Sequence, residues 1–401
     1  MTTTHSSTRN PGAPLSTGKN AVPFVVGDDT GHGSTSVALP TTSVLSYWRD
    51  YFQPESRAPL ANHSTGLIAA RLHRLLSTLG PVAYYDNAER PRDLQADLFI
   101  GHFWSFAKMC EVNRFQRSVA VYTLSDPLAA RAQLQEAATR RGVPMPDWDL
   151  PPPDFDHEAT MERADLVLLC GNSHTLATFP SRWQDKVRLF NYALEQDLWA
   201  TPSSHADRRS DFVYVATHCG LRKGFLDVIA TWRLIAPGTA RLHVVGHLDK
   251  PYDAMLAAAN TEGVIVHGWI DSASIRYQRL LRSCRFAYIP TWVEGQMGTL
   301  LEAIFAGCIP ITTAASGVDD ELLAHCIVVD PMRPHQHRKA IEEALSWSPE
   351  SCQRRSDALQ TGARRRHSWS RFDYEVGTTL VDLLGLGGKS PGEGSVNVRD
   401  S

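Results

Sequence analysis

The sequence has no closely spaced pair of cysteines, and its seven cysteines are scattered over 401 residues. An odd number of thiols without CxxC spacing argues against a disulfide framework, so we expect reduced cysteines. No apolar run reaches the length that spans a bilayer. The N-terminal stretch MTTTHSSTRN also lacks the basic and apolar regions of a secretory signal. These absences predict a cytoplasmic protein.

The chain also lacks a strong excess of charge of either sign, because its formal net charge is −3 and its pI is about 6.6. Without a basic excess there is no general reason to expect a nucleic-acid partner. His335 and His337 are closely spaced, but no third ligand stands near them, so we expect no metal site. No internal repeat is visible.

The length of the chain exceeds what one hydrophobic core usually organises and therefore predicts two domains. Residues 1–40 and 386–401 are rich in Ser, Thr, Gly and Pro and are predicted to be disordered tails. Between them, short apolar runs alternate with helical patterns, which favours parallel sheets with crossover helices. The polar stretch at 200–210 separates two sets of about five strands each. We therefore expect domains at 41–203 and 204–368, followed by a helix at 369–385.

The expected strands lie at 43–48, 82–85, 97–101, 118–122, 165–170, 211–216, 242–246, 264–268, 286–290 and 308–312. The expected helices lie at 65–79, 225–236, 252–260, 273–284, 299–306, 336–347 and 369–384. In such a fold the carboxyl ends of the parallel strands face the ligand.

The segment TWVEGQMGTLLEAIFAGCIP at 291–310 predicts a loop, a helix and a buried strand. Gly295 and Gly298 permit a tight turn before a run of strong helix formers. A helix N-terminus offers unpaired N–H groups and the positive end of a dipole, so this corner suits a phosphate. Glu302, one turn inside the helix, is placed to accept hydrogen bonds from a ribose, and Glu294 to hold hydroxyls of a neighbouring group. The alternative is that an acid in the first turn only favours the helix dipole.

A second motif, HCGLRKGF at 218–225, joins a predicted strand to a predicted helix. Lys223 supplies a point charge and Arg222 a forked donor, and together they can neutralise a diphosphate leaving group. A solvated basic turn is the alternative interpretation. Because this turn occurs together with the spaced glutamates, a pyrophosphate site is the better hypothesis.

These motifs resemble the retaining GT-B glycosyltransferases of the large family 4, also called group 1. The resemblance covers roughly 211–330 and is carried by RKG at 222–224, LHVVGHL at 242–248, VIVHGWI at 264–270 and EGQMGTLLEAIFAGCIPITT at 294–313. Weaker similarity occurs at 96–104 and 164–199. The segment SWSRFDYEV at 368–376 resembles the helix that crosses back onto the first domain in this fold. The resemblance implies two facing Rossmann-like domains with a central cleft, the acceptor bound in the first and the nucleotide sugar in the second.

Position by position, the resemblance implies that Glu302 holds the ribose hydroxyls and Glu294 the hydroxyls of the transferred sugar. Lys223 and Arg222 would bind the diphosphate. The other residues assigned to the nucleotide sugar are the turn of Gly295, Gln296, Met297 and Gly298, the helix start at Thr299 and Leu300, and His267, Trp269 and Ile270 beside the base.

The family usually has an arginine where this chain has Thr217, so Arg222 or His218 would have to replace that charge. In the first domain, His102 matches the histidine that ends a strand on the acceptor side of the cleft. Trp104 lies two residues after His102, and Gly66 is the residue that matches the family's glycine-rich loop. Gly66 and Trp104 are the acceptor-side candidates, and His102 is a candidate catalytic residue together with Glu294, Lys223 and Arg222.

The resemblance implies transfer with retention of configuration, without an obligatory metal ion and without a cofactor beyond the nucleoside-diphosphate sugar. The sequence agrees with this in having no DxD-type carboxylate pair at a plausible strand end, since Asp319 and Asp320 lie past a turn. A sugar-nucleotide epimerase, a glycan phosphorylase and a catalytically silent nucleotide-sugar-binding scaffold remain alternatives. A glycan, a lipid and a small molecule are the candidate acceptors. The basic cluster at 364–367 is interpreted as a solvated face, or as a peripheral contact to anionic lipid.

Overall fold

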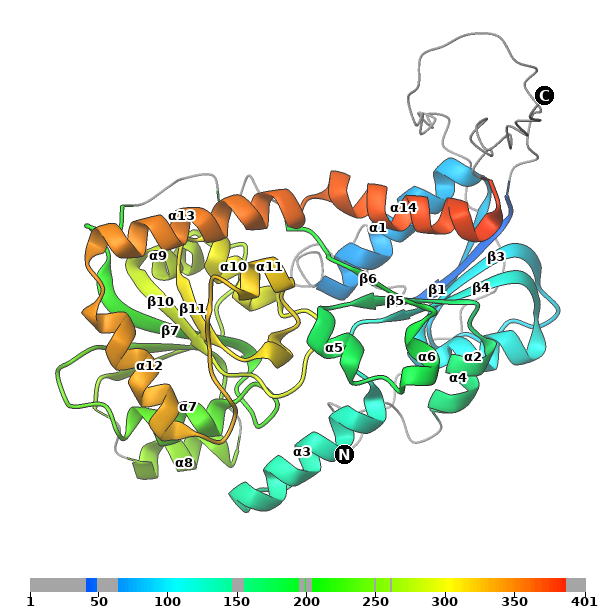
Figure 1. Ribbon diagram of the computed structural model, residues 1–401. Helices are drawn as coiled ribbons and strands as arrows, with labels where there is room; N and C mark the ends of the chain where they lie inside the picture. The colour runs from blue at the N-terminus through cyan, green and yellow to red at the C-terminus, as the bar shows by residue number, and fades with distance from the viewer. Residues whose placement is uncertain are drawn as a thin grey trace, which may run out of the picture.

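The computed structural model describes residues 41–48, 64–145, 155–194, 199, 204–248, 250–259 and 262–386. These residues form two α/β domains, each built on a parallel sheet of six strands (Figure 1). The tail predicted at 1–40, and all but the first residue of the tail predicted at 386–401, lie outside the described residues.

The first domain carries a sheet with the strand order β2-β1-β3-β4-β5-β6. Its strands are β1 (Ser43–Tyr47), β2 (Val82–Asp86), β3 (Gln95–His102), β4 (Arg114–Tyr122), β5 (Leu166–Cys170) and β6 (Val187–Phe190). Its helices are α1 (Ser64–Leu79), α2 (Phe103–Val112), α3 (Pro127–Arg141), α4 (His157–Arg163), α5 (Ser173–Ala177) and α6 (Ser181–Gln184). The central strands β1 and β5 are buried over their whole length, because helices cover both faces of a parallel sheet.

The second domain carries a sheet with the strand order β12-β11-β10-β7-β8-β9. Its strands are β7 (Arg209–His218), β8 (Leu242–His247), β9 (Val264–Gly268), β10 (Cys284–Ile289), β11 (Ile309–Thr312) and β12 (Ile327–Val328). Its helices are α7 (Phe225–Trp232), α8 (Tyr252–Ala259), α9 (Ile275–Ser283), α10 (Gly298–Phe305), α11 (Asp320–Leu323), α12 (Pro334–Ser346) and α13 (Pro349–Arg366). A short 3-10 turn, η3 (Ala314–Ser316), follows β11.

The last helix, α14 (Trp369–Leu384), returns to the first domain, where it lies against α1 and β6 (Figure 1). Arg71 of α1 and Asp373 of α14 form a two-point ion pair, in which Arg71 Nε lies 2.6 Å from Asp373 Oδ1. The Arg71 guanidinium also lies over the ring of Trp369, 5.5 Å from its centroid. Both contacts attach the end of the chain to the domain in which the chain begins.

The fold class predicted from the sequence, two doubly wound α/β domains, is confirmed, but each sheet has six strands instead of about five. The two that were missed are β6, whose central residues are exposed, and β12, which is only two residues long. The predictions also missed α2, α3, α4 and α13, and the short helices α5, α6 and α11. Helix α2 follows β3 without an intervening loop, and α3 and α13 have few apolar residues to produce a helical period.

Replacing Arg71 by alanine should weaken the attachment of α14, because it removes a partly buried two-point ion pair and a contact with Trp369. We expect the free energy of unfolding to fall by about 1–2 kcal/mol, measured by urea denaturation. Arg74→Ala, an exposed site on the same helix, is the control and should change stability by less than about 0.5 kcal/mol. Equal effects of the two substitutions would contradict a specific role for Arg71.

Candidate functional site

The two motifs singled out in the sequence meet at the point where the second sheet changes direction. Strands β7 and β10 are neighbours in the sheet, and the chain continues from them to opposite sides, through β8 and through β11. The basic turn follows β7, and the loop that carries Glu294 follows β10. Ligands of doubly wound sheets bind at such a switch point, beyond the carboxyl ends of the strands.

Main-chain contacts fix the basic turn against the end of β10. Gly224 has φ +71°, and a Cβ at this position would lie 1.9 Å from the carbonyl oxygen of Pro290. The carbonyl oxygen of Arg222 accepts hydrogen bonds from Thr291 Oγ1 at 2.9 Å and from the Trp292 amide at 2.8 Å. Glycine is therefore required at 224, since any side chain would separate the turn from the strand end.

Glu294 is the centre of a buried cluster of charges. Its side chain is 6% exposed, and its Oε1 lies 3.2 Å from Arg222 Nη1 and forms an ion pair with Lys223 Nζ. Burial by itself raises the pKa of Glu294, but Arg222 and Lys223 outweigh burial and lower the pKa below its ordinary value. The carboxylate is therefore ionised, and the three side chains together carry one net positive charge.

Glu302 is buried on α10 and bound by a tyrosine that the sequence predictions did not include. The hydroxyl of Tyr277, on α9, donates to Glu302 Oε2 at 2.5 Å. Burial raises the pKa of Glu302 to about 7. Tyr277 was missed because an aromatic residue on the apolar side of a helix has the pattern of a core residue.

Tyr192 brings a first-domain side chain to the start of α10. Its hydroxyl oxygen would lie 2.3 Å from a Cβ placed on Gly298, and it has no hydrogen-bond partner among the described residues. Helix α10 has no side-chain cap at Met297. Thr299 Oγ1 donates to the Val215 carbonyl at 3.2 Å, and Leu300 is fully buried. Thus the N-terminus of α10 meets the first domain.

The turn at 295–297 packs between the domains, a placement that the sequence did not predict. A Cβ on Gly295 would lie 2.3 Å from the carbonyl oxygen of Thr123. Gln296 Oε1 accepts from the Tyr192 amide at 3.0 Å. The amide of Met297 donates to the Ser316 carbonyl at 2.9 Å, so this N–H is already bonded. The assignment of the rest of this turn to the nucleotide sugar stays a prediction.

The residues expected beside a base separate into two groups. The ring of His218 lies 5.2 Å from that of His247, which in turn stacks on Trp269 at 6.1 Å, and Trp269 is 46% exposed. Ile270 is buried. These residues lie at the ends of β7, β8 and β9.

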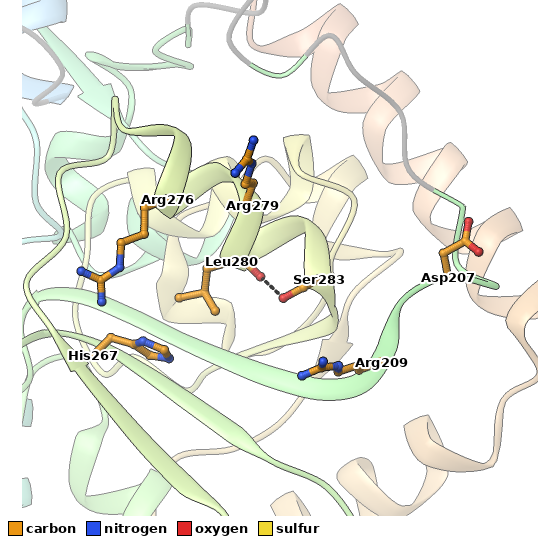
Figure 2. A pocket seen from close by; sticks show the side chains of 7 residues that line it. All are labelled: Asp207, Arg209, His267, Arg276, Arg279, Leu280 and Ser283. Atoms are coloured by element: carbon orange, nitrogen blue, oxygen red, sulfur yellow. Dashed lines mark hydrogen bonds between the residues drawn. The ribbon is translucent and has the colours of Figure 1, made fainter.

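His267, in contrast, faces a cavity of about 540 Å³ beneath α9 (Figure 2). Its Nε2 lies 2.9 Å from His243 Nδ1. Figure 2 shows Arg276 and Leu280 of α9 on one side of this cavity and His267 on the strand opposite. His267 therefore lies apart from Trp269, which follows the end of β9 after Gly268 (φ +69°) and stacks on His247.

The first-domain candidates form an aromatic cluster at the end of β3. His102 is 1% exposed, its Nδ1 accepts from the Trp104 amide at 3.4 Å, and its ring lies 4.3 Å from that of Trp48. Burial lowers the pKa of His102 to about 3, so the ring is neutral and carries its proton on Nε2. Gly66 is buried in the first turn of α1, next to residues 49–63, which lie outside the described residues.

The basic cluster at 364–367 was interpreted as a solvated face, and for two of its residues that interpretation is wrong. Arg366 Nη2 lies 2.6 Å from Asp319 Oδ2, and the buried ring of His367 contacts the Tyr192 carbonyl through Nδ1 at 2.9 Å. Arg365 pairs with Glu321. These contacts hold the junction of α13 and α14 against the rest of the chain.

Comparison with known protein families matches most of the second domain. Residues 209–346 match the family of group 1 glycosyl transferases. A search of curated proteins found no match. In the described residues, no helix combines the length and apolar character needed to cross a membrane.

Solved structures share the whole architecture. A sucrose-phosphate synthase from Thermosynechococcus elongatus has a TM-score of 0.64 at 14% identity, covering 86% of this chain and 100% of that one. HepE from Anabaena, solved with UDP and glucose, has a TM-score of 0.56 at 12% identity, covering 85% and 100%. A trehalose-phosphate synthase from Burkholderia xenovorans has a TM-score of 0.52 at 12% identity, covering 80% and 79%. At these identities the likeness identifies the fold, which is GT-B.

The raised pKa of Glu302 makes the stability of the chain depend on pH. The folded chain keeps this proton up to about pH 7, whereas an ordinary glutamate loses it near 4.5. The unfolded chain therefore releases the proton first as pH rises, and the contribution of Glu302 to stability is full below 4.5 and lost through pH 7. We expect the free energy of unfolding to fall by about 2–3 kcal/mol between pH 4.5 and 8 through this group.

Glu302→Gln removes the titrating group, but the glutamine can still accept the hydrogen bond from Tyr277. The free energy of unfolding of this variant should therefore lack the fall of about 2–3 kcal/mol between pH 4.5 and 8. The measurement is urea denaturation of both proteins over that pH range. Glu343→Gln, an exposed site on α12, is the control and should follow the wild type. If the wild-type and Glu302→Gln curves run parallel, the pKa of Glu302 is the same in the folded and the unfolded chain, which would contradict the prediction.

Proposed function

We propose that this chain is a glycosyltransferase that moves a sugar from a nucleoside-diphosphate sugar to an acceptor hydroxyl, with retention of configuration and without an obligatory metal ion. One observation carries the proposal: Arg222, Lys223 and Glu294 form a buried cluster at the switch point of the domain that matches group 1 glycosyl transferases. The fold is shared with HepE, which was solved with UDP and glucose, and with a trehalose-phosphate synthase.

Lys223 and Arg222 are the groups that we assign to the diphosphate. As the bond between the sugar and the phosphate breaks, negative charge grows on the leaving oxygen, and two cations held by main-chain contacts need no reorganisation to stabilise it. Burial strengthens this effect, because charges interact more strongly where water is excluded. The family's usual arginine is replaced by Thr217 in this chain. Arg222 is a better candidate than His218 to supply the missing charge, because Arg222 pairs with Glu294 beside Lys223 whereas the ring of His218 lies against His247.

Glu294 and Glu302 are the groups that we assign to hydroxyls. Glu294 is ionised and can accept hydrogen bonds from the transferred sugar. Glu302, which accepts a hydrogen bond from Tyr277 of α9, lies in the first turns of α10. The N-terminus of α10 has no side-chain cap and favours an adjacent phosphate. His102 can donate from Nε2 but cannot remove a proton, because Nδ1 already accepts the Trp104 amide.

In the retaining reaction that we propose, the acceptor hydroxyl attacks the sugar from the side that the phosphate leaves. The bond between the anomeric carbon and the phosphate oxygen breaks, a bond to the acceptor oxygen forms, and the acceptor's proton passes to the departing phosphate. No protein base is required, so the task of the chain is electrostatic and positional.

The proposal is tested by incubating the protein with a panel of uridine, guanosine and adenosine diphosphate sugars, and measuring release of free nucleoside diphosphate. Each donor is assayed with and without an extract that supplies acceptors, and with and without a chelator. Acceptor-dependent release that survives chelation supports the proposal. Tight donor binding without release indicates a silent scaffold, and release of an altered sugar nucleotide indicates an epimerase.

Lys223→Met should lower turnover about a hundredfold, because losing one preorganised contact to a developing charge costs ~3 kcal/mol of transition-state stabilisation. The fold should survive, since Glu294 keeps Arg222 as a partner and methionine retains most of the apolar stem. The measurements are kcat and the melting temperature. Lys339→Met, an exposed site on α12, is the control. Unchanged kcat in Lys223→Met would remove Lys223 from the mechanism.

A further inference from the structure

Asp227, in the first turn of α7, is a buried carboxylate that binds three separate parts of the chain. Its side chain is 1% exposed. Oδ1 forms an ion pair with Arg141 of the first domain and accepts from the Met332 amide at 3.0 Å. Oδ2 accepts from the indole Nε1 of Trp292 at 2.7 Å. Both oxygens are therefore used, and Arg141 is the one of these three partners that carries a positive charge.

The contact with Arg141 is the direct link between α3 and the second domain at this place. Figure 1 shows α3 extending from the first domain toward α7 and α8. Between these helices lies a cavity of about 340 Å³, whose lining includes Arg141, Leu226 and Met255. The helices are therefore not closely packed beside the ion pair, and a charged contact holds them where apolar packing is incomplete.

The contact with Trp292 connects Asp227 to the site. Trp292 lies in the loop between β10 and Glu294, and its amide binds the Arg222 carbonyl at 2.8 Å. The same residue thus holds the basic turn through its backbone and Asp227 through its indole. Met332, the third partner, has φ +64°, a conformation that is uncommon outside glycine and that the hydrogen bond to Asp227 helps to maintain.

We infer that Asp227 is a positioning residue that holds the loop of Trp292 and Glu294 in its working place only when Arg141 of the first domain has docked. The inference rests on the proposed function, because the loop it positions belongs to the proposed donor site. Asp227 itself pairs with Arg141, Trp292 and Met332, not with Lys223 or Glu294. The arrangement makes the geometry of the site depend on contact between the domains.

The physical reason is the cost of leaving a buried carboxylate without its cation. With Arg141 withdrawn, Asp227 keeps only two uncharged donors, and a buried charge in that state draws in water or rotates toward it. Either response lengthens the hydrogen bond to Trp292. The indole of Trp292 then loses its hydrogen bond to Asp227, and the hydrogen bond from its amide to the Arg222 carbonyl remains.

The first arm of the test is kinetic. In Arg141→Gln and in Trp292→Phe, which keeps an aromatic ring but removes Nε1–H, kcat should fall about tenfold while the KM for the nucleotide sugar stays within about twofold. Arg141→Lys retains the charge and should recover part of kcat. Arg140→Gln is the control, because Arg140 stands next to Arg141 but pairs only with Glu136 on the exposed side of α3.

The second arm does not require activity. Amide hydrogen exchange of the segment 288–298 should be faster in Arg141→Gln and in Trp292→Phe than in the wild type or in Arg140→Gln, and melting temperatures identify any variant that fails to fold. If Arg141→Gln and Trp292→Phe both show the exchange rates and the kcat of the wild type, the inference is wrong. If the wild type turns over no donor, the proposed function fails and the exchange arm alone decides whether Asp227 positions the loop.

Discussion

The site depends on one electrostatic constraint, the burial of the Glu294 carboxylate between two cations at the ends of neighbouring strands. An isolated carboxylate would take up a proton in such a place, but Arg222 and Lys223 keep this one ionised. Those cations are held in turn by the backbone of their own loop, through the carbonyl of Arg222 and the close approach at Gly224. Charge and main-chain geometry are thus fixed together, which gives a preorganised site without a bound ligand.

The second constraint is the packing of the turn at 295–297 between the domains. Gly295 lies against Thr123 of the first domain, and a Cβ on Gly317, which has φ +65°, would fall 1.3 Å from the Gly295 carbonyl oxygen. Glycine is therefore needed on both sides of the turn for the backbones to approach. Gln296 and Tyr192 add hydrogen bonds across the same boundary. Because this turn joins Glu294 to α10, both acids lie next to backbone that contacts the first domain.

The contacts around Asp227 and around Arg366 place charged groups at two further points where the domains meet. Arg141 reaches Asp227 from α3, and Arg366 holds Asp319 beside Asn191 at the junction of α13 and α14. Ion pairs of this kind are strongly dependent on geometry, since a buried charge that loses its partner is costly. They therefore favour a small set of domain arrangements more than a large apolar interface would.

The sequence by itself determined the fold class, most strand positions in both domains and the two motifs of the site, because apolar periodicity, glycine and the order of strand, turn and helix are local properties. It also indicated that Lys223, Arg222 and Glu294 would come together, since parallel strands deliver their carboxyl ends to one edge. Only the tertiary structure decided the roles of Tyr192, Tyr277 and Asp227, and the inward direction of Arg366. The physical reason is that burial and partner choice depend on segments far apart in the chain. A tyrosine at an apolar position has the same local sequence pattern whether it only packs or also donates a hydrogen bond. A run of arginines likewise has the same pattern whether it contacts water or a carboxylate.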